Sequence, residues 1–318
     1  MENNFWLTME DGVEVYVKKW ETPGEKPKAL VQLAHGMVEH IQRYNEFARY
    51  LLSHGYFVYG NDHRGHGKTG EKQGLLGHFA DQDGFAKTTE DLHVITNHMK
   101  QEYPDTPVIL IGHSMGSFLA RLYIQQYSHG LDGVILSGSG YFPKLISQAG
   151  KRLAAMLPPR ESSPLMNQLV FGSYNKRTKK ETSVDWLSRN ESAVESYLND
   201  PLSGYIPTAR FFYDLLDGLI VMHSEKRNRM IRKDLPLLFV SGGEDPVGDY
   251  GKGVWKAAHH YQKAGLENVA TMLFEHGRHE LLHETNKAEV FTALHSWVEN
   301  IASPGEKRTF LESPTGNI

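Results

Sequence analysis

The hydrophobic positions of the chain form short runs that alternate with longer stretches of helical spacing. Helical spacing is clear from Tyr44 to Leu52 and from Phe85 to Glu102. Alternation of strand and helix predicts a mostly parallel sheet covered by helices on both faces. Buried parallel strands are apolar on both faces. Four short runs have this character, and they are Ala29–Ala34, Tyr56–Gly60, Val108–Ile111 and Gly133–Ser137.

One long segment interrupts this alternation. From Tyr141 to Arg232 the apolar spacing indicates helices and no strand. We therefore expect a core formed by residues 1–140 and 233–303, a helical cap at 141–232 and a C-terminal tail at 304–318. The predicted cap helices are Leu145–Leu157, Leu165–Phe171, Val184–Leu198 and Ala209–His223. The predicted core also has strands at Phe5–Met9, Val13–Trp20, Pro236–Ser241 and Thr271–Phe274, and a last helix at Lys287–Ile301.

Composition narrows the function classes. The 318 residues carry a formal net charge of -4, which gives no electrostatic attraction for nucleic acid. The chain has no cysteine, so disulfides, thiolate metal sites and cysteine nucleophiles are excluded. It shows no signal peptide and no apolar run of the ~18 residues that a membrane span needs. We expect a soluble, cytoplasmic protein without a cofactor.

The strongest chemical motif lies between a predicted strand and a predicted helix. It reads Gly112-His113-Ser114-Met115-Gly116, the arrangement of a nucleophile elbow, where a sharp turn lifts the serine hydroxyl clear of the sheet. A serine hydroxyl needs a base to take its proton, and the base needs a carboxylate to orient it. In a nucleophile-elbow hydrolase the serine comes first in the chain, then the acid, then the histidine. The candidates after Ser114 are Glu244 or Asp245 as the acid, and His276, His279 or His283 as the histidine.

These motifs resemble those of the monoacylglycerol lipase and lysophospholipase family of α/β-hydrolases. The family carries five motifs in one order, and each has a match here. The matches are His35-Gly36-Met37-Val38-Glu39-His40, Asp62-His63-Arg64-Gly65-His66-Gly67, Gly112 to Gly116, Asp245-Pro246-Val247-Gly248, and Gly277-Arg278-His279-Glu280.

The resemblance implies roles for particular residues. Ser114 would be the nucleophile, Asp245 the acid and His279 the base. The backbone N–H groups of Met37 and Met115 would form the oxyanion hole. The resemblance implies a serine hydrolase that cleaves monoacylglycerols or lysophospholipids, with a cap that touches lipid surfaces. His35, Asp62, Arg64 and Gly67 are expected to be structural residues of the loops beside the site.

Three alternative interpretations remain at the level of sequence. His279-Glu280-Leu281-Leu282-His283 also matches the H-E-x-x-H zinc motif, although that reading leaves the other motifs unexplained. A proline iminopeptidase-like serine peptidase would use cap carboxylates to hold a free amine, and Glu191, Glu195 and Asp200 are the candidates. The third alternative is a ligand receptor that uses this fold without catalysing a reaction, because a fold alone does not determine function.

Overall fold

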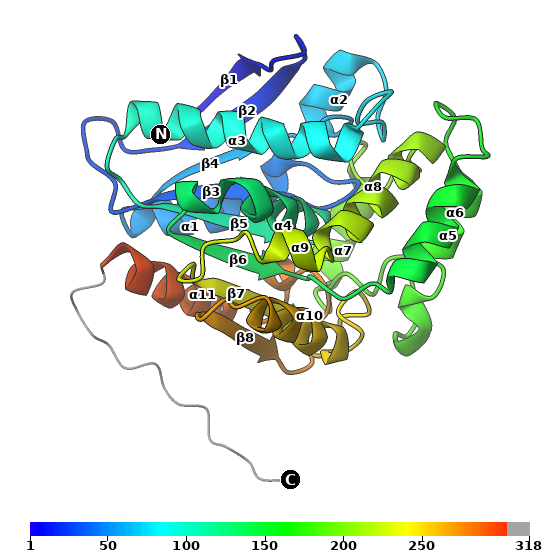
Figure 1. Ribbon diagram of the computed structural model, residues 1–318. Helices are drawn as coiled ribbons and strands as arrows, with labels where there is room; N and C mark the ends of the chain where they lie inside the picture. The colour runs from blue at the N-terminus through cyan, green and yellow to red at the C-terminus, as the bar shows by residue number, and fades with distance from the viewer. Residues whose placement is uncertain (304–318) are drawn as a thin grey trace.

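An eight-stranded sheet forms the centre of the computed structural model, which describes residues 1–303 (Figure 1). The strand order is β1-β2-β4-β3-β5-β6-β7-β8, antiparallel at β1-β2 and β2-β4 and parallel from β4 through β8. The predicted α/β-hydrolase sheet is confirmed, while the predicted tail at 304–318 lies outside the described residues. The strands are β1 Glu2–Thr8, β2 Glu14–Trp20, β3 Leu30–Ala34, β4 Phe57–Asn61, β5 Val108–His113, β6 Gly133–Ser137, β7 Leu237–Gly242 and β8 Val269–Phe274.

Helices cover both faces of the sheet because the central strands are apolar on both faces. In β5, Val108 and Leu110 pack into one hydrophobic cluster with α3, α4 and α10, whereas Ile109 and Ile111 pack into the other with α1 and α11. The core helices are α1 Asn45–Ser53, α2 Gly67–Gln73, α3 Gly84–Glu102, α4 Met115–Tyr127, α10 Lys252–Lys263 and α11 Lys287–Ala302. The 3-10 helices are η1 Ile41–Tyr44, η2 Ser128–Gly130, η3 Tyr174–Arg177 and η4 Leu281–His283.

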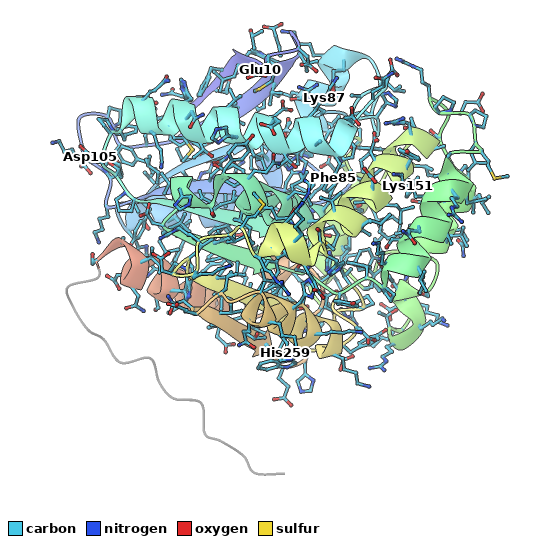
Figure 2. The ribbon with its side chains drawn as sticks, in the orientation of Figure 1. Glu10, Phe85, Lys87, Asp105, Lys151 and His259 are labelled. Carbon is cyan, nitrogen blue, oxygen red and sulfur yellow. The ribbon has the colours of Figure 1, made fainter. Side chains whose placement is uncertain are left out.

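The insertion between β6 and β7 carries five α-helices. Its helix α8 packs on α3 and α4 of the core and on α5, so α5 and α6 lie on the outside of α8 (Figure 1). Phe85 of α3 points inward beneath α8 (Figure 2), and a Cβ on Gly218 of α8 would stand 2.3 Å from its ring. The helices are α5 Lys144–Ala154, α6 Pro164–Phe171, α7 Glu191–Asn199, α8 Ala209–Met222 and α9 Glu225–Asn228.

Two helix predictions need correction. The helix predicted at Val184–Leu198 begins only at Glu191, because the carbonyls of Trp186 and Leu187 accept the N–H groups of His279 and Glu280 and so are not used in a helix. Helix α10 was missed, although its buried residues Val254, Ala257, Ala258 and Tyr261 have helical spacing. No helix within residues 1–303 is both long and apolar enough to cross a membrane.

Candidate active site

Ser114 stands in a strained turn between β5 and α4. Its backbone has φ 50° and ψ -119°, in the left-handed half of conformational space that residues other than glycine rarely adopt. Strain of this kind persists only where the surrounding structure imposes it, and it concentrates at functional sites. The Ser114 side chain is half-buried and lines a cavity, as a nucleophile elbow requires.

The glycines on either side of Ser114 are required by close backbone contacts. A Cβ on Gly116 would lie 2.1 Å from the carbonyl oxygen of Ala34 in β3. A Cβ on Gly112 would lie 2.4 Å from the carbonyl oxygen of Gly116. The two glycines of the Gly-x-Ser-x-Gly pattern therefore allow the start of α4 to pack closely against the carboxyl ends of β3 and β5.

Asp245 follows β7 and is completely buried. Both of its carboxylate oxygens lie 3.0 Å from His279 Nδ1. The Val247 N–H and the Ser241 hydroxyl also donate to it, at 2.9 and 3.1 Å. Burial disfavours the charged carboxylate, but the nearby His279 and these donors hold the pKa of Asp245 below its ordinary value.

His279 follows β8 and is turned toward Asp245. Burial disfavours the imidazolium, yet the negative charge of Asp245 raises the pKa of His279 above its ordinary value. Because Nδ1 faces the carboxylate, Nε2 is the nitrogen left for a base. Within the described residues no hydrogen bond joins His279 to Ser114, although both line one cavity. Such bonds are often long before substrate binds.

Two backbone amides near Ser114 have no acceptor among the described residues. They belong to Met37, in the loop after β3, and to Met115, the first residue of α4. The amide of Gly36, by contrast, donates to Glu39. A Cβ on Gly36 would lie 3.3 Å from the Ser114 Cβ, so this loop passes directly beside the serine. Free donors on two sides of a nucleophile suit the stabilisation of an oxyanion.

The alternative acid and bases lie elsewhere. Glu244 is exposed, and only its backbone N–H contacts the histidine loop, through Gly277. His276 is exposed and faces Glu275. His283 is half-buried in η4, and its Nε2 has no hydrogen-bond partner among the described residues. Asp245 and His279 are thus the acid and histidine that the structure brings together.

The H-E-x-x-H motif does not form a metal site. Glu280 binds Arg43 through both carboxylate oxygens, each at 2.7 Å, so its charge is already neutralised. Only residues 281–283 are helical, so His279 and His283 do not share a helix face. Within residues 1–303 no group of three or more potential ligands is placed to hold a metal ion.

The side chains of His35 and Asp62, which were expected to be structural, form hydrogen bonds with backbone groups of their own and neighbouring loops. His35 accepts the His63 N–H at Nε2 and donates from Nδ1 to the Gly36 carbonyl, which braces the loop of Met37. Asp62 accepts the backbone N–H groups of Ile41 and Lys68. A Cβ on Gly67 would lie 2.3 Å from the Asp62 carboxylate, which explains this glycine.

Two cavities meet at Ser114. We call the first, of about 220 Å³, the apolar cavity, and it lies among α4, α5, α6 and α8. The second, of about 170 Å³, is the polar cavity. The two share Met37, Ser114, Phe171 and Trp186. The apolar cavity is otherwise lined mainly by Met115, Phe118, Phe142, Ile146, Leu169, Val170, Tyr174, Leu215, Leu216, Leu219 and Val247. The polar cavity has the polar lining residues Glu39, His113, Asn167, Ser183, Tyr197, Tyr205, His279 and Glu280.

Sequence reasoning missed a buried ion cluster beside the polar cavity. Arg43 lies between Glu280 and Glu39, and Glu39 also accepts the Gly36 N–H and the Tyr44 hydroxyl at 2.8 Å. The cluster therefore ties the loop of Met37 to the loop of His279. The positions of Glu39 and Glu280 within two motifs were visible in the sequence, but nothing there pointed to Arg43.

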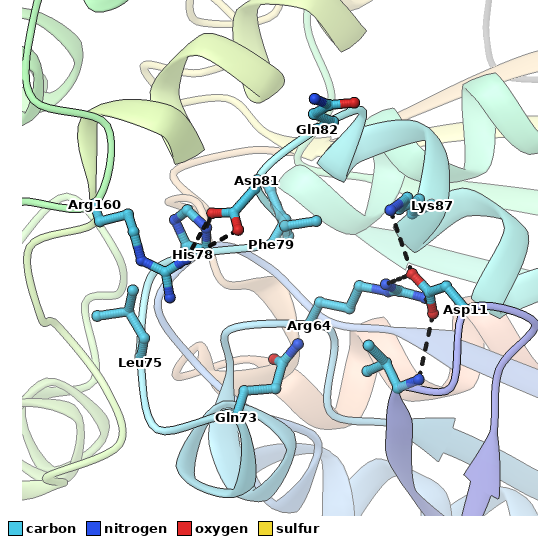
Figure 3. Close-up of a pocket in the computed structure, with 12 residues that line it drawn as sticks. Asp11, Arg64, Gln73, Leu75, His78, Phe79, Asp81, Gln82, Lys87 and Arg160 are labelled. Atoms are coloured by element: carbon cyan, nitrogen blue, oxygen red, sulfur yellow. Dashed lines mark hydrogen bonds and ion pairs between the residues drawn. The ribbon is translucent and has the colours of Figure 1, made fainter.

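A further cavity, of about 460 Å³, lies apart from Ser114 (Figure 3). Arg64 reaches into it and binds Asp11 and the buried Asp91, so its charge is compensated. On the other side, Arg160 from the insertion pairs with Asp81. The Arg64 pairs join segments of the core, and the Arg160–Asp81 pair connects the insertion to the core.

The fold and the elbow with its acid–histidine pair define the class, an α/β-hydrolase. The family model described as serine aminopeptidase, S33 matches residues 25–286, and the chain belongs to this family. The chain is 28% identical to the monoacylglycerol lipase of Mycolicibacterium smegmatis, covering 90% of this chain and 93% of that one. It is 25% identical to phospholipase YtpA of Bacillus subtilis, covering 88% and 98%.

Solved structures show the same architecture over nearly the whole chain. The structure of a thermostable carboxyl esterase from Bacillus coagulans, in complex with glycerol, superposes with a TM-score of 0.87 at 29% identity. The match covers 95% of this chain and 99% of that esterase. The similarity therefore includes the insertion as well as the core.

Proposed function

We propose that this protein is a serine hydrolase that cleaves monoacylglycerols or lysophospholipids to a fatty acid and an alcohol through an acyl-enzyme. The chain is a carboxylic-ester hydrolase by its family and its lipase, phospholipase and esterase relatives. The observation that supports the residue assignment is that Ser114, in its strained turn, and His279 line one cavity, while the buried Asp245 binds His279 Nδ1.

The proposed reaction has two half-reactions. His279 Nε2 takes the proton of Ser114 Oγ as that oxygen attacks the ester carbonyl, and Asp245 stabilises the imidazolium that forms. The N–H groups of Met37 and Met115 stabilise the oxyanion. The ester C–O bond breaks, and the alcohol leaves with the proton from His279. Water then attacks the acyl-enzyme by the same steps, and the fatty acid is released.

The two cavities suit the two parts of such a substrate. An acyl chain gains about 0.8 kcal/mol for each methylene removed from water, so it belongs in the apolar cavity. The alcohol belongs in the polar cavity, where the Asn167 amide and the Ser183 hydroxyl are among the lining groups that could bind its hydroxyls. Both cavities include Ser114 in their lining, so a substrate with one part in each cavity has its ester carbonyl next to the serine.

The peptidase alternative has less support. Glu191 and Glu195 are exposed on α7, and neither lines the two cavities. Asp200 is bound to His40 at 2.6 Å and to the Ser203 hydroxyl. The carboxylates that do line the polar cavity, Glu39 and Glu280, share Arg43 and so offer little net charge to an amine.

The outer helices of the insertion offer a surface for lipid aggregates. Leu145 and Ile146 of α5 are 79% and 69% exposed, and Leu165 and Leu169 of α6 are also exposed. Ile146 and Leu169 line the apolar cavity as well, so that cavity adjoins the exposed apolar surface. We infer that this surface touches lipid and that acyl chains enter beside it.

One substrate panel tests the proposal. Purified protein is given monoacylglycerols, lysophosphatidylcholine and a proline amide, and Ser114→Ala serves as the inactive control. We expect ester hydrolysis to exceed amide hydrolysis and the variant to lose at least about 10³-fold in kcat with its fold intact by circular dichroism. Faster cleavage of the amide, or retained turnover by Ser114→Ala, contradicts the proposal.

A further inference from the structure

Arg121 is a cation that lies in the core without a carboxylate partner. It belongs to α4, the helix that begins directly after Ser114, and it is completely buried. Within residues 1–303 its hydrogen bonds go to uncharged groups and it forms no ion pair. The groups around its guanidinium are the Gly140 carbonyl at 2.8 Å, the Tyr261 hydroxyl at 2.9 Å, His223 Nδ1 at 3.4 Å and the Ser139 hydroxyl at 3.5 Å. Because a buried charge without a counter-charge is costly, its presence here indicates a role beyond packing.

Two of the groups that Arg121 contacts belong to residues 138–140, which we call the support segment. This segment follows β6 and is buried along its whole length. Its first residue, Gly138, has φ 59° and touches the catalytic histidine, since a Cβ there would lie 2.8 Å from His279 Cε1. The support segment is therefore part of the surface against which the imidazole of His279 rests.

The support segment also contacts the loop of the acid and adjoins the nucleophile. A Cβ on Gly140 would lie 2.2 Å from the carbonyl oxygen of Val247, whose N–H binds Asp245. Ser137, the residue before the segment, accepts the Ser114 N–H at 2.8 Å. One short stretch of chain thus meets the backbone or side chain around all three proposed catalytic residues.

Little except Arg121 restrains the far end of this stretch. Two of its three residues are glycines, which have no side chain to hold them and are conformationally free. Directly after Gly140 the chain enters the insertion, so a movement of the insertion would be passed to the support segment. A hydrogen bond from a charged guanidinium to the Gly140 carbonyl is stronger than a neutral one and opposes such movement.

We propose that Arg121 is a positioning residue for the hydrolysis, which holds the support segment in the place where His279 and the Asp245 loop are aligned with Ser114. This inference rests on the proposed ester hydrolysis. Arg121 lines neither the apolar nor the polar cavity, so its loss should leave substrate binding intact and slow the chemical step.

The first test compares Arg121→Met and Arg121→Lys with wild type on p-nitrophenyl butyrate. Arg121→Met should lose about 10²-fold in kcat with KM nearly unchanged, because a small displacement of a catalytic group has an effect of this size. Arg121→Lys keeps a cation that can donate to the Gly140 carbonyl, and it should recover part of this loss. A wild-type kcat in Arg121→Met overturns the inference, and so does a loss that lies in KM.

The matched control is Gln125→Met, one turn further along α4. Gln125 is 3% exposed and donates to the carbonyls of Val221 and Met222 and to the Asn228 side chain, away from the support segment. Thermal unfolding followed by circular dichroism should show a loss of stability in this variant, while its kcat stays at the wild-type value. A fall in kcat equal to that of Arg121→Met would mean that any loosening of α4 slows the enzyme, which overturns the inference.

A double-mutant cycle with Gly138→Ala tests the route of the effect. The added Cβ would displace His279 and should lower kcat on its own. If Arg121 acts through the same segment, the double variant should lose less than the product of the two single losses. Losses that multiply overturn the inference. If Arg121→Met does not fold, Arg121→Lys takes its place in each comparison. Absence of ester turnover in wild type would instead overturn the proposed function itself.

Discussion

At the scale of single residues, the site depends on how one carboxylate offsets the burial of one imidazole. Burial alone would lower the pKa of His279, and the adjacent charge of Asp245 reverses that shift. A neutral imidazole is the form that accepts a proton from Ser114. Activity should therefore rise with pH as His279 loses its proton, through a pKa above the ordinary histidine value.

Asp245→Asn tests this balance. The substitution removes the charge that raises the pKa of His279, so burial then dominates and the acid limb of kcat/KM should move to lower pH. The maximum should fall by roughly 10⁴-fold, because the imidazole loses its preferred tautomer. A pH profile for a short-chain ester gives both values. An acid limb that stays in place would show that another group controls the proton transfer.

At the scale of elements, the loops after β3 and β8 are joined by the cluster of Glu39, Arg43 and Glu280. Burial would raise the pKa of Glu280, but Arg43 lowers it to about 2. A depressed pKa contributes stability above the ordinary pKa of the carboxyl group, and that stability is lost as pH falls toward the depressed value. The cluster should thus stabilise the fold at neutral pH and progressively less in acid.

Arg43→Ala should destabilise the protein by about 3–5 kcal/mol at pH 7, because it leaves two buried carboxylates without a counter-charge. Urea unfolding measures the difference. The control Arg49→Ala removes an arginine that is 62% exposed and pairs with Glu2 at the surface, and it should cost less than about 1 kcal/mol. The gap between wild type and Arg43→Ala should narrow from pH 5 to pH 3. A gap independent of pH would argue against the ion cluster as its cause.

At the scale of the whole molecule, the insertion places an apolar outer surface next to the apolar cavity. Leu145→Ser combined with Ile146→Ser should weaken binding to lipid vesicles and lower activity on aggregated monoacylglycerol several-fold, while activity on a dissolved short-chain ester changes little. Met230→Ser is the control, since Met230 is 66% exposed but lies outside α5 and α6. Vesicle co-sedimentation and the two assays measure the effect. An equal loss in the control or with the dissolved ester would refute a role at lipid surfaces.

The sequence by itself determined the sheet, the helical insertion and the elbow of Ser114, because burial on both faces and tight turns leave local patterns. It narrowed the acid and base to neighbouring candidates. Only the tertiary structure joined Arg43 to Glu280, 237 positions away, and laid Trp186 against His279. Only the tertiary structure also left residues 184–190 without a helix. Such contacts leave no pattern in the local sequence, because they depend on which distant segments the sheet topology brings together at the carboxyl ends of the strands.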